Sequence, residues 1–478
     1  MVFSSLIFLF VFLSVHLLLY RLAGRKYKNA VLLVSSLLFY AWGGPRYLLL
    51  LLLETAVSWF FAKKIDEAKD LNPYDNRMQK VYLALTCIIL LGLLAVFKYL
   101  GFFMQTIKDL TGVPIKVLSL ALPIGISFYT FQLLSYVVDV YRGQVPAQLK
   151  YWKLLLYSSL FHQCIAGPIV RYETVRNEID ERKVTYNDVY LGVRRFSVGL
   201  AKKAILANSC AVLADTFLAV PKEQLMTQSV LGLWFGVGCY MLQIYFDFSA
   251  YSDMAIGMGR MVGFHYMENF NYPYIAASVQ EFWRRWHISL SSFFRDYVYI
   301  PLGGSRVGAG KVIRNLFVVW FLTGLWHGAS VNYILWGLYY FLFLLLERYV
   351  IKGRMPKLLG HCYTLLVVFF GWAIFKFENM GELWIVIKGL LGFNNAAICS
   401  MEVKTQFLSH IFFLLFAMIA VTPFGKLIRK TMLQMGTRRQ KVLYLTSLLD
   451  MITPVLLFLL AALALVGNSY NPFLYFQF

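Results

Sequence analysis

Charged residues are scarce in this chain of 478 residues, in which Asp, Glu, Lys and Arg make up 14% and apolar residues 59%. A soluble globular protein has about 25% charged residues, so the composition excludes a soluble enzyme, a disordered chain and a fibre. It also disfavours an outer-membrane barrel, because the apolar residues form long runs and do not alternate with polar ones. The sequence therefore predicts an all-α polytopic membrane protein.

The chain also lacks paired cysteines. Its six cysteines are scattered, and no two of them form a Cys-x-x-Cys pair. Neither a disulfide framework nor a zinc site is indicated. We therefore expect no metal and no permanently bound cofactor.

Acidic residues are few relative to basic ones, and the 45 Lys and Arg against 24 Asp and Glu give a net charge of +21. In a soluble protein this excess would suggest nucleic acid. Here the basic residues lie between apolar runs, where they hold loops on the cytoplasmic side of a membrane. We predict a multi-pass protein of the cell (inner, cytoplasmic) membrane that contacts membrane lipid and binds no nucleic acid. Binding of an anionic ligand by some of these loops is the alternative.

The apolar runs predict about 11–12 transmembrane helices. They fall near residues 4–20, 30–42, 46–62, 81–100, 117–138, 197–218, 229–249, 315–330, 333–347, 361–376, 406–422 and 448–466.

The distribution of charge predicts the orientation. No basic residue precedes the first run and four follow it within 21–28, which indicates a retained first span with its N-terminus outside. The basic stretches 171–203 and 426–441 should then be cytoplasmic. This requires 151–170, which Gly167-Pro168 interrupts, to be re-entrant and buried within the protein. With neither a long linker nor an internal repeat, we expect a single membrane domain over 1–478.

Residues 240–330 interrupt the apolar pattern with polar and ionisable side chains, including Asp247, Asp253, Asn269, Arg284, Arg285 and Arg295. Ionisable groups within a membrane are costly, and they often mark a binding site or a pathway. Ion pairs that hold helices together are the alternative for Asp247 and Asp253.

The segment from Glu281 to Leu290 predicts one amphipathic interfacial helix, because its Trp and Arg residues suit the boundary between water and lipid. His287 follows Trp283 by four residues, so both should share one helix face. A histidine here fits either a structural hydrogen-bonding role or a catalytic one.

His327 lies at the end of an apolar run, with Gly324 and Gly328 close by in the sequence. An imidazole at this depth needs a polar cavity or a partner, and small neighbours allow a substrate to approach closely. Histidine is also well suited to act as a base near neutral pH. The residues alone fit a general base and a packed core histidine equally well.

Several segments together resemble the membrane-bound O-acyltransferase family, and within it the bacterial alginate O-acetyltransferase-like branch. They are Met1–Ser5, Phe39–Trp42, Pro123–Tyr129, Ala166–Tyr172, Asp247–Gly257, Glu268–Tyr274, Glu281–Ser289, Phe294–Gly304, Thr323–Ala329 and Asn471–Phe478. The resemblance covers nearly the whole chain. One departure is Ala250, where the pattern has Gly; a single methyl group there casts little doubt on activity.

The resemblance implies helices around a central funnel or tunnel, with a catalytic core at about 120–350. It implies transfer of an acetyl or other acyl group from a cytoplasmic thioester, such as acetyl-CoA, to a hydroxyl acceptor for O-acetylation of an extracytoplasmic polysaccharide. His327 corresponds to the invariant histidine, here a general base, and His287 to a second important polar position. Further expected substrate-binding residues are Trp326, Asp247, Asp253, Trp283, Arg284, Arg285, Ser289, Arg295 and Asn269.

Arg284, Arg285 and Arg295 could meet the phosphates of coenzyme A, or they could serve only as cytoplasmic anchors. The resemblance also implies a separate extracytoplasmic partner that resembles a serine hydrolase and completes the transfer. Two other functions remain as alternative hypotheses. One is D-alanyl transfer to teichoic acid, and the other is a transporter, against which the lack of an inverted repeat argues.

Overall fold

The computed structural model describes residues 2–114, 116–118, 120–165, 167–467 and 473–474. Met1, Ala166 and most of the closing motif (471–472 and 475–478) lie outside the described residues. Every regular element within the described ranges is a helix, which confirms the predicted all-α fold.

The chain divides into two compact units. The first unit comprises residues 1–196, 252–268 and 292–301, and the second comprises 197–251, 269–291 and 302–478. The helices α9 (Tyr186–Ala201), α12 (Val230–Met261) and α14 (Ile288–Phe294) each contribute residues to both units. The expected single domain over 1–478 stays a prediction.

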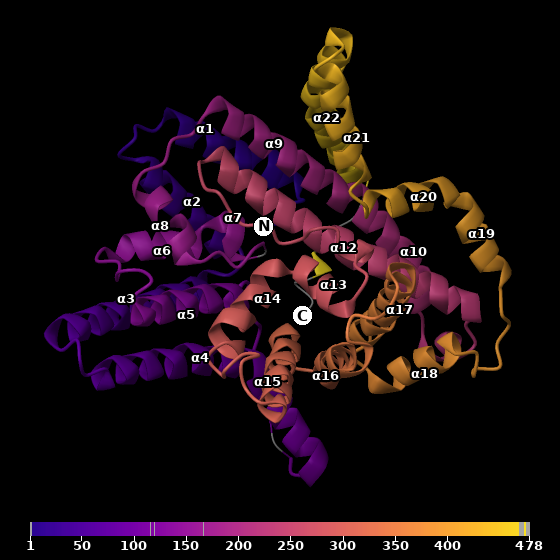
Figure 1. Ribbon diagram of the computed structural model, residues 1–478, viewed down its shortest axis with the longest axis horizontal. Coiled ribbons are helices and arrows are strands. Elements are labelled where there is room, and N and C mark those ends of the chain that lie inside the picture. Colours follow the sequence, from indigo (N-terminus) through magenta and orange to yellow (C-terminus); the bar gives the residue numbers. More distant parts are fainter. Residues whose placement is uncertain (1, 115, 119, 166, 468–472, 475–478) are drawn as a thin grey trace. The chain divides into compact units, whose positions relative to one another are not determined.

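The first unit contains a layer in which α3, α4 and α5 lie side by side (Figure 1). The helices of this unit are η1 (Ile7–Leu13), α1 (Ser14–Leu22), α2 (Lys28–Trp42), α3 (Pro45–Leu71), α4 (Arg77–Thr111), α5 (Ile126–Arg142), α6 (Tyr151–Ser159), α7 (Phe161–Cys164), α8 (Tyr172–Asp180) and η4 (Arg295–Tyr299).

The segment expected to be re-entrant is broken and buried. Helix α6 ends at Ser159, Leu160 leaves the helical conformation, and α7 is a single turn. Residues 154–165 are all buried, as a non-spanning backbone at membrane depth requires.

The second unit holds most of the C-terminal half of the chain. Its helices are η2 (Lys202–Ala207), α10 (Asn208–Leu218), α11 (Lys222–Met226), η3 (Pro273–Ile275), α13 (Val279–Arg285), α14 (Ile288–Phe294), α15 (Ala309–His327), α16 (Val331–Leu345), η5 (Leu346–Ile351), α17 (Lys357–Lys376), α18 (Met380–Leu390), α19 (Met401–Ser409), α20 (Ile411–Ala420), α21 (Phe424–Gly436) and α22 (Gln440–Val466). Helices α15 and α16 pack closely, and α21 pairs with α22 as a hairpin (Figure 1).

Among the described residues, six helices are long and apolar enough to cross a membrane, or seven if the bent pair α19 and α20 forms one span. This is fewer than the expected 11–12, because some apolar runs form shorter helices. Ile7–Leu22 and Lys28–Trp42 are two such cases. The chain is nevertheless a multi-pass membrane protein, as predicted.

The span expected near residues 197–218 begins earlier in the structure, within the basic stretch 171–203. Residues 186–218 form one continuous helical stretch that is a candidate span. Lys203 lies within it and is 2% exposed. A buried lysine in a span needs a counter-charge, and its partner belongs to the site described next.

Candidate active site

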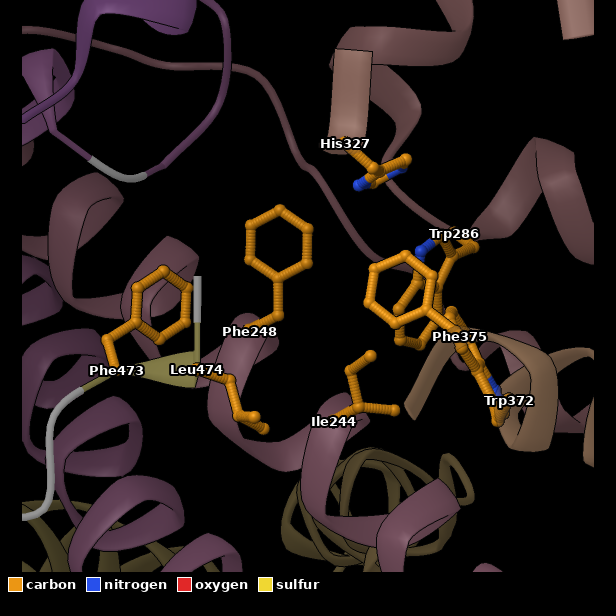
Figure 2. A pocket seen from close by; sticks show the side chains of 8 residues that line it. All are labelled: Ile244, Phe248, Trp286, His327, Trp372, Phe375, Phe473 and Leu474. Atoms are coloured by element: carbon orange, nitrogen blue, oxygen red, sulfur yellow. The ribbon is translucent and has the colours of Figure 1, made fainter. Parts of the chain in front are cut away.

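The second unit contains a narrow pocket with an estimated cavity volume of about 20 Å³ (Figure 2). One of its lining residues is an ionisable side chain and the other seven are aromatic or aliphatic. They are Ile244 and Phe248 of α12, Trp286, His327 of α15, Trp372 and Phe375 of α17, and Phe473 and Leu474. The pocket therefore presents one imidazole to an otherwise apolar space.

Close packing of two helices fixes the position of His327. A Cβ atom at Gly324 of α15 would clash with the carbonyl of Tyr333, and one at Gly337 of α16 would clash with the carbonyl of Trp320. Glycine at both positions therefore allows α15 and α16 to approach each other closely. His327 is the last residue of α15 and is 6% exposed.

Aromatic rings fix the orientation of the His327 imidazole. Its ring centroid lies 4.9 Å from that of Trp336, 5.1 Å from Trp326 and 5.2 Å from Phe375, all edge-on. Trp326, an expected substrate-binding residue, is thus a direct neighbour of the histidine, although it does not line the pocket.

His287 occupies a break between two helices, and the predicted single helix over 281–290 was wrong. Helix α13 ends at Arg285 and α14 begins at Ile288. His287 has a φ of +43°, a left-handed conformation that is uncommon for residues other than glycine. The break turns His287 out of the helical register with Trp283 that the sequence suggested. Strained residues of this kind often occur at functional sites.

The imidazole of His287 is enclosed by aromatic rings. It lies 4.7 Å from Phe248 and 5.6 Å from Trp326, measured between ring centroids. Both ring nitrogens are buried, and within the described part of the chain they have no hydrogen-bond partner. Burial lowers the pKa of His287 to about 3, so the ring is neutral at physiological pH.

Hydrogen bonds accepted by Asn269 hold the start of α14. Its side-chain oxygen accepts hydrogen bonds from the backbone N–H (3.2 Å) and hydroxyl (2.8 Å) of Ser289, and its carbonyl accepts one from the N–H of Ile288. The predicted residues Asn269 and Ser289 are therefore brought together, as supports for the backbone next to His287.

The N-terminus of α13 is capped by side chains. Ser278 accepts a hydrogen bond from the N–H of Glu281, whose carboxylate in turn accepts one from Ala277. Glu347 accepts from the N–H groups of Val279 and Gln280. These bonds satisfy donors that a helix leaves free at its start, and they fix the segment that leads into the break.

Asp247 forms a buried ion pair with Lys203 at 2.7 Å, and the exposures of the two side chains are 1% and 2%. The second carboxylate oxygen accepts a hydrogen bond of 2.8 Å from the backbone N–H of Leu474. Phe473 stacks on Tyr251 with ring centroids 3.9 Å apart. Asp247 thus anchors the part of the C-terminal segment that lines the pocket, and the ion-pair interpretation of this residue fits the structure.

Two of the predicted residues, Asp253 and Arg295, belong to the first unit. Asp253 pairs with Arg195 at 2.6 Å. Arg295 pairs with Asp296, which also binds Arg171. In the structure both residues take part in ion pairs, which fits the alternative interpretation given for Asp253; the anchoring role considered for Arg295 stays a prediction.

The remaining predicted residues, Arg284, Arg285 and Trp283, lie in the second unit and do not line the pocket. Arg284 is exposed, whereas Arg285 pairs with Glu281 at 2.8 Å. Trp283 packs edge-on against Trp336 and other rings, and because Trp336 contacts His327, Trp283 supports the histidine from one layer away.

Most of the pocket wall was missed from the sequence. Phe248 and Trp286 lie inside motifs in which only neighbouring residues, such as Asp247 and Arg285, were predicted to bind substrate. Trp372 and Phe375 lie in an apolar run without a polar marker, and nothing in the sequence distinguishes them from lipid-facing residues. Phe473 belongs to the closing motif Asn471–Phe478. The family resemblance includes this motif but does not indicate where it lies in the fold.

The arrangement suits acid–base chemistry in a space with an apolar lining. A neutral imidazole can accept a proton from a hydroxyl group, and exclusion of water protects a reactive acyl group from hydrolysis. Among the described residues, no three His, Cys, Asp or Glu side chains gather closely enough to hold a metal ion.

Comparison with known proteins identifies the family of this chain. The model of the MBOAT, membrane-bound O-acyltransferase family matches residues 143–380. The chain is 35% identical to the probable alginate O-acetylase of Pseudomonas aeruginosa, with both chains fully covered. It is 31% identical to the peptidoglycan O-acetyltransferase of Helicobacter pylori, over 100% of this chain and 98% of that one. A partial match, 28% identical over 53% of this chain and 68% of the relative, is to the teichoic acid D-alanyltransferase of Bacillus subtilis. The chain therefore belongs to the membrane-bound O-acyltransferase family, in its alginate O-acetyltransferase-like branch.

Proposed function

We propose that this protein transfers an acetyl group from a thioester on the cytoplasmic side of the inner membrane to a hydroxyl group, for O-acetylation of an extracytoplasmic polysaccharide. The observation that carries the proposal is His327, a single imidazole in the wall of an apolar pocket. The full-length similarity to two O-acetyltransferases that are named for polymers of the cell envelope supports acetyl as the acyl group.

His327 acts as the general base. Its imidazole accepts the proton of the acceptor hydroxyl while the oxygen attacks the thioester carbonyl. The C–S bond then breaks, and the leaving thiolate takes up the proton from the imidazolium, so that ester and free thiol are the products. General-base catalysis contributes about 10²–10⁴-fold in rate, or roughly 3–5 kcal/mol of barrier.

His287 orients the donor or stabilises charge that develops on the carbonyl oxygen. As a neutral imidazole it has one N–H donor, and a donor aimed at developing charge is effective in a water-free site. Its contact with Phe248, which lines the pocket, supports this role.

Acetyl-CoA is the proposed donor, and another acyl thioester, such as one on a carrier protein, is the alternative. Arg284 is the most available of the three expected phosphate ligands, because it is exposed and makes no ion pair within the described residues. Arg285 and Arg295 each already have a carboxylate partner. We also propose a separate extracytoplasmic partner, similar to a serine hydrolase, that completes the transfer.

The test uses sealed inside-out membrane vesicles from cells that produce the protein, its partner and the acceptor polysaccharide. Labelled acetyl-CoA is added outside, at the cytoplasmic face. Label should enter the polysaccharide fraction within the vesicles, and His327→Ala should abolish this. Incorporation of D-alanine but not acetyl would instead support the teichoic acid alternative, which the partial match to a D-alanyltransferase keeps open.

The direction of transfer has its own test. Cysteine at Lys183 or Arg438, both exposed and in the basic stretches, should resist an impermeant thiol reagent added to intact cells. Arg182 is a poor choice, because its guanidinium binds Tyr20 and Asn29. Rapid labelling from outside would reverse the side from which the donor enters.

A further inference from the structure

We infer that the pocket beside His327 selects the acyl group by length and by charge, and that Ile244 limits the length. The inference rests on the proposed function, because it takes the pocket as the place where the acyl part of the thioester lies. It makes the protein specific for acetyl over longer acyl groups and over aminoacyl groups such as D-alanyl.

The size of the pocket supports selection by length. A cavity of about 20 Å³ exceeds only slightly the roughly 10–15 Å³ that a single water molecule needs by this measure. A methyl group is similar in size to water, so the methyl of an acetyl group fills this space. Each further methylene would have to displace side chains of the wall.

The wall has little freedom to yield. Phe375 is held between Tyr333 and Trp336, at ring-centroid distances of 5.0 Å and 5.3 Å. Phe248 is held between His287 and Phe473, at 4.7 Å and 5.8 Å. Because tightly packed rings cannot move without opening gaps elsewhere, the volume of the pocket is fixed by its surroundings.

Ile244 closes the end of the pocket away from the base. In Figure 2 the imidazole of His327 lies at one end and Ile244 at the other. Ile244 precedes Phe248 by one turn of α12, so both side chains share one helix face. It is 6% exposed. A chain that extends from a carbonyl at His327 would therefore reach Ile244.

The chemistry of the wall supports selection by charge. None of the eight described lining residues carries a carboxylate. The ammonium group of a D-alanyl thioester would therefore be buried without a counter-charge, which is strongly unfavourable. D-alanyl and isobutyryl have nearly the same shape and differ mainly in this charge, so the pair separates charge from size.

The experiment compares acetyl-, isobutyryl-, butyryl- and D-alanyl-CoA as labelled donors in the vesicle assay described above. The variants are Ile244→Ala, the milder Ile244→Val, and the control Ile256→Ala. Ile256 lies on the same helix, is 8% exposed and does not line the pocket. One extra or missing methylene group in a substrate changes the ratio of kcat/KM values in a hydrophobic pocket by about 10–200-fold.

The wild-type protein should transfer acetyl at least about 10-fold better than butyryl or isobutyryl. Ile244→Ala should raise the butyryl-to-acetyl and isobutyryl-to-acetyl ratios by about 10-fold or more, and Ile244→Val should raise them less. D-alanyl transfer should stay low in every variant, and Ile256→Ala should keep the wild-type ratios.

Unchanged ratios in both Ile244 variants, or equal transfer of butyryl and acetyl by the wild type, would overturn selection by length. Transfer of D-alanyl as efficient as that of isobutyryl by Ile244→Ala would overturn selection by charge. In each of these cases the proposed acyl transfer itself stands. If the wild-type protein transfers none of the four acyl groups, neither from CoA nor from a carrier-protein thioester, the proposed function falls and the inference falls with it.

Discussion

His327 and His287 are both buried histidines of the second unit, and they differ in what their rings face. His327 ends a regular helix and lines a cavity, whereas His287 lies in a strained break with its ring between Phe248 and Trp326. The first is placed by two closely packed helices, and the second by hydrogen bonds of the backbone. Similar burial therefore does not imply similar surroundings: the ring of His327 lines the pocket, whereas the ring of His287 contacts Phe248 of the pocket wall.

The largest predicted effect on stability concerns the support of the His327 pocket. Lys203→Met leaves the Asp247 carboxylate buried without its counter-charge. Removing one partner of a buried pair costs about 3–5 kcal/mol, so thermal unfolding of the purified protein in detergent should shift strongly downward. Lys183→Met, an exposed control, should change stability by less than about 0.5 kcal/mol. A stable Lys203→Met variant would show that the ion pair does not hold this side of the site.

A smaller effect, in the acidic range, concerns His287. Burial lowers the pKa of this histidine from 6.5 to about 3, so the unfolded chain binds its proton more readily than the folded protein. The stability that depends on the neutral ring is present above about pH 6.5 and is lost as pH falls towards 3.

At about 1.4 kcal/mol per pH unit, this histidine alone should lower the free energy of unfolding by about 2 kcal/mol between pH 6.5 and 5. Unfolding curves of wild type and His287→Gln over this range test the point. The variant should lose less stability on acidification, and identical pH dependence of both proteins would be inconsistent with a buried neutral His287.

The smallest predicted effect concerns the hydrogen bonds beside the break. Ser289→Ala removes the hydroxyl that donates to Asn269 and keeps the backbone hydrogen bond. Loss of one such bond costs about 1 kcal/mol, visible as a small shift in unfolding. The exposed control Ser305→Ala should be nearly neutral. A cost above about 3 kcal/mol for Ser289→Ala would mean that the break depends on this hydroxyl far more than a single hydrogen bond explains.

The helical class and the histidine His327 could be predicted from the sequence because each has a local signal. Long apolar runs indicate spans, and an imidazole between glycines within such a run is conspicuous. The helix break at His287 could not be predicted, because the periodicity of 281–290 is that of one continuous helix. The pairing of Lys203 with Asp247 could not be predicted either, because the two residues are 44 positions apart along the chain and pairing over such a distance has no local signal.

The residues of the pocket wall also could not be predicted from the sequence. Trp372 and Phe375 look like any residues of an apolar span, and only the fold shows that they face His327. Asp247 stood out as a polar group within a span, and its carboxylate contacts Lys203 and the backbone of Leu474, which fits the ion-pair interpretation; a role in substrate binding stays a prediction.

The central claim is that His327 performs the chemistry of acyl transfer, and its most direct test is acetyl transfer by His327→Ala in the vesicle assay. His361→Ala provides the matched control, because His361 lies on α17 outside the pocket and, within the described part of the chain, bonds the carbonyl of Ala276. We expect that His327→Ala inserts and unfolds like the wild type, still binds acetyl-CoA, and transfers acetyl at least about 10²-fold more slowly, while His361→Ala stays active. Wild-type transfer by His327→Ala would show that His327 is not the general base.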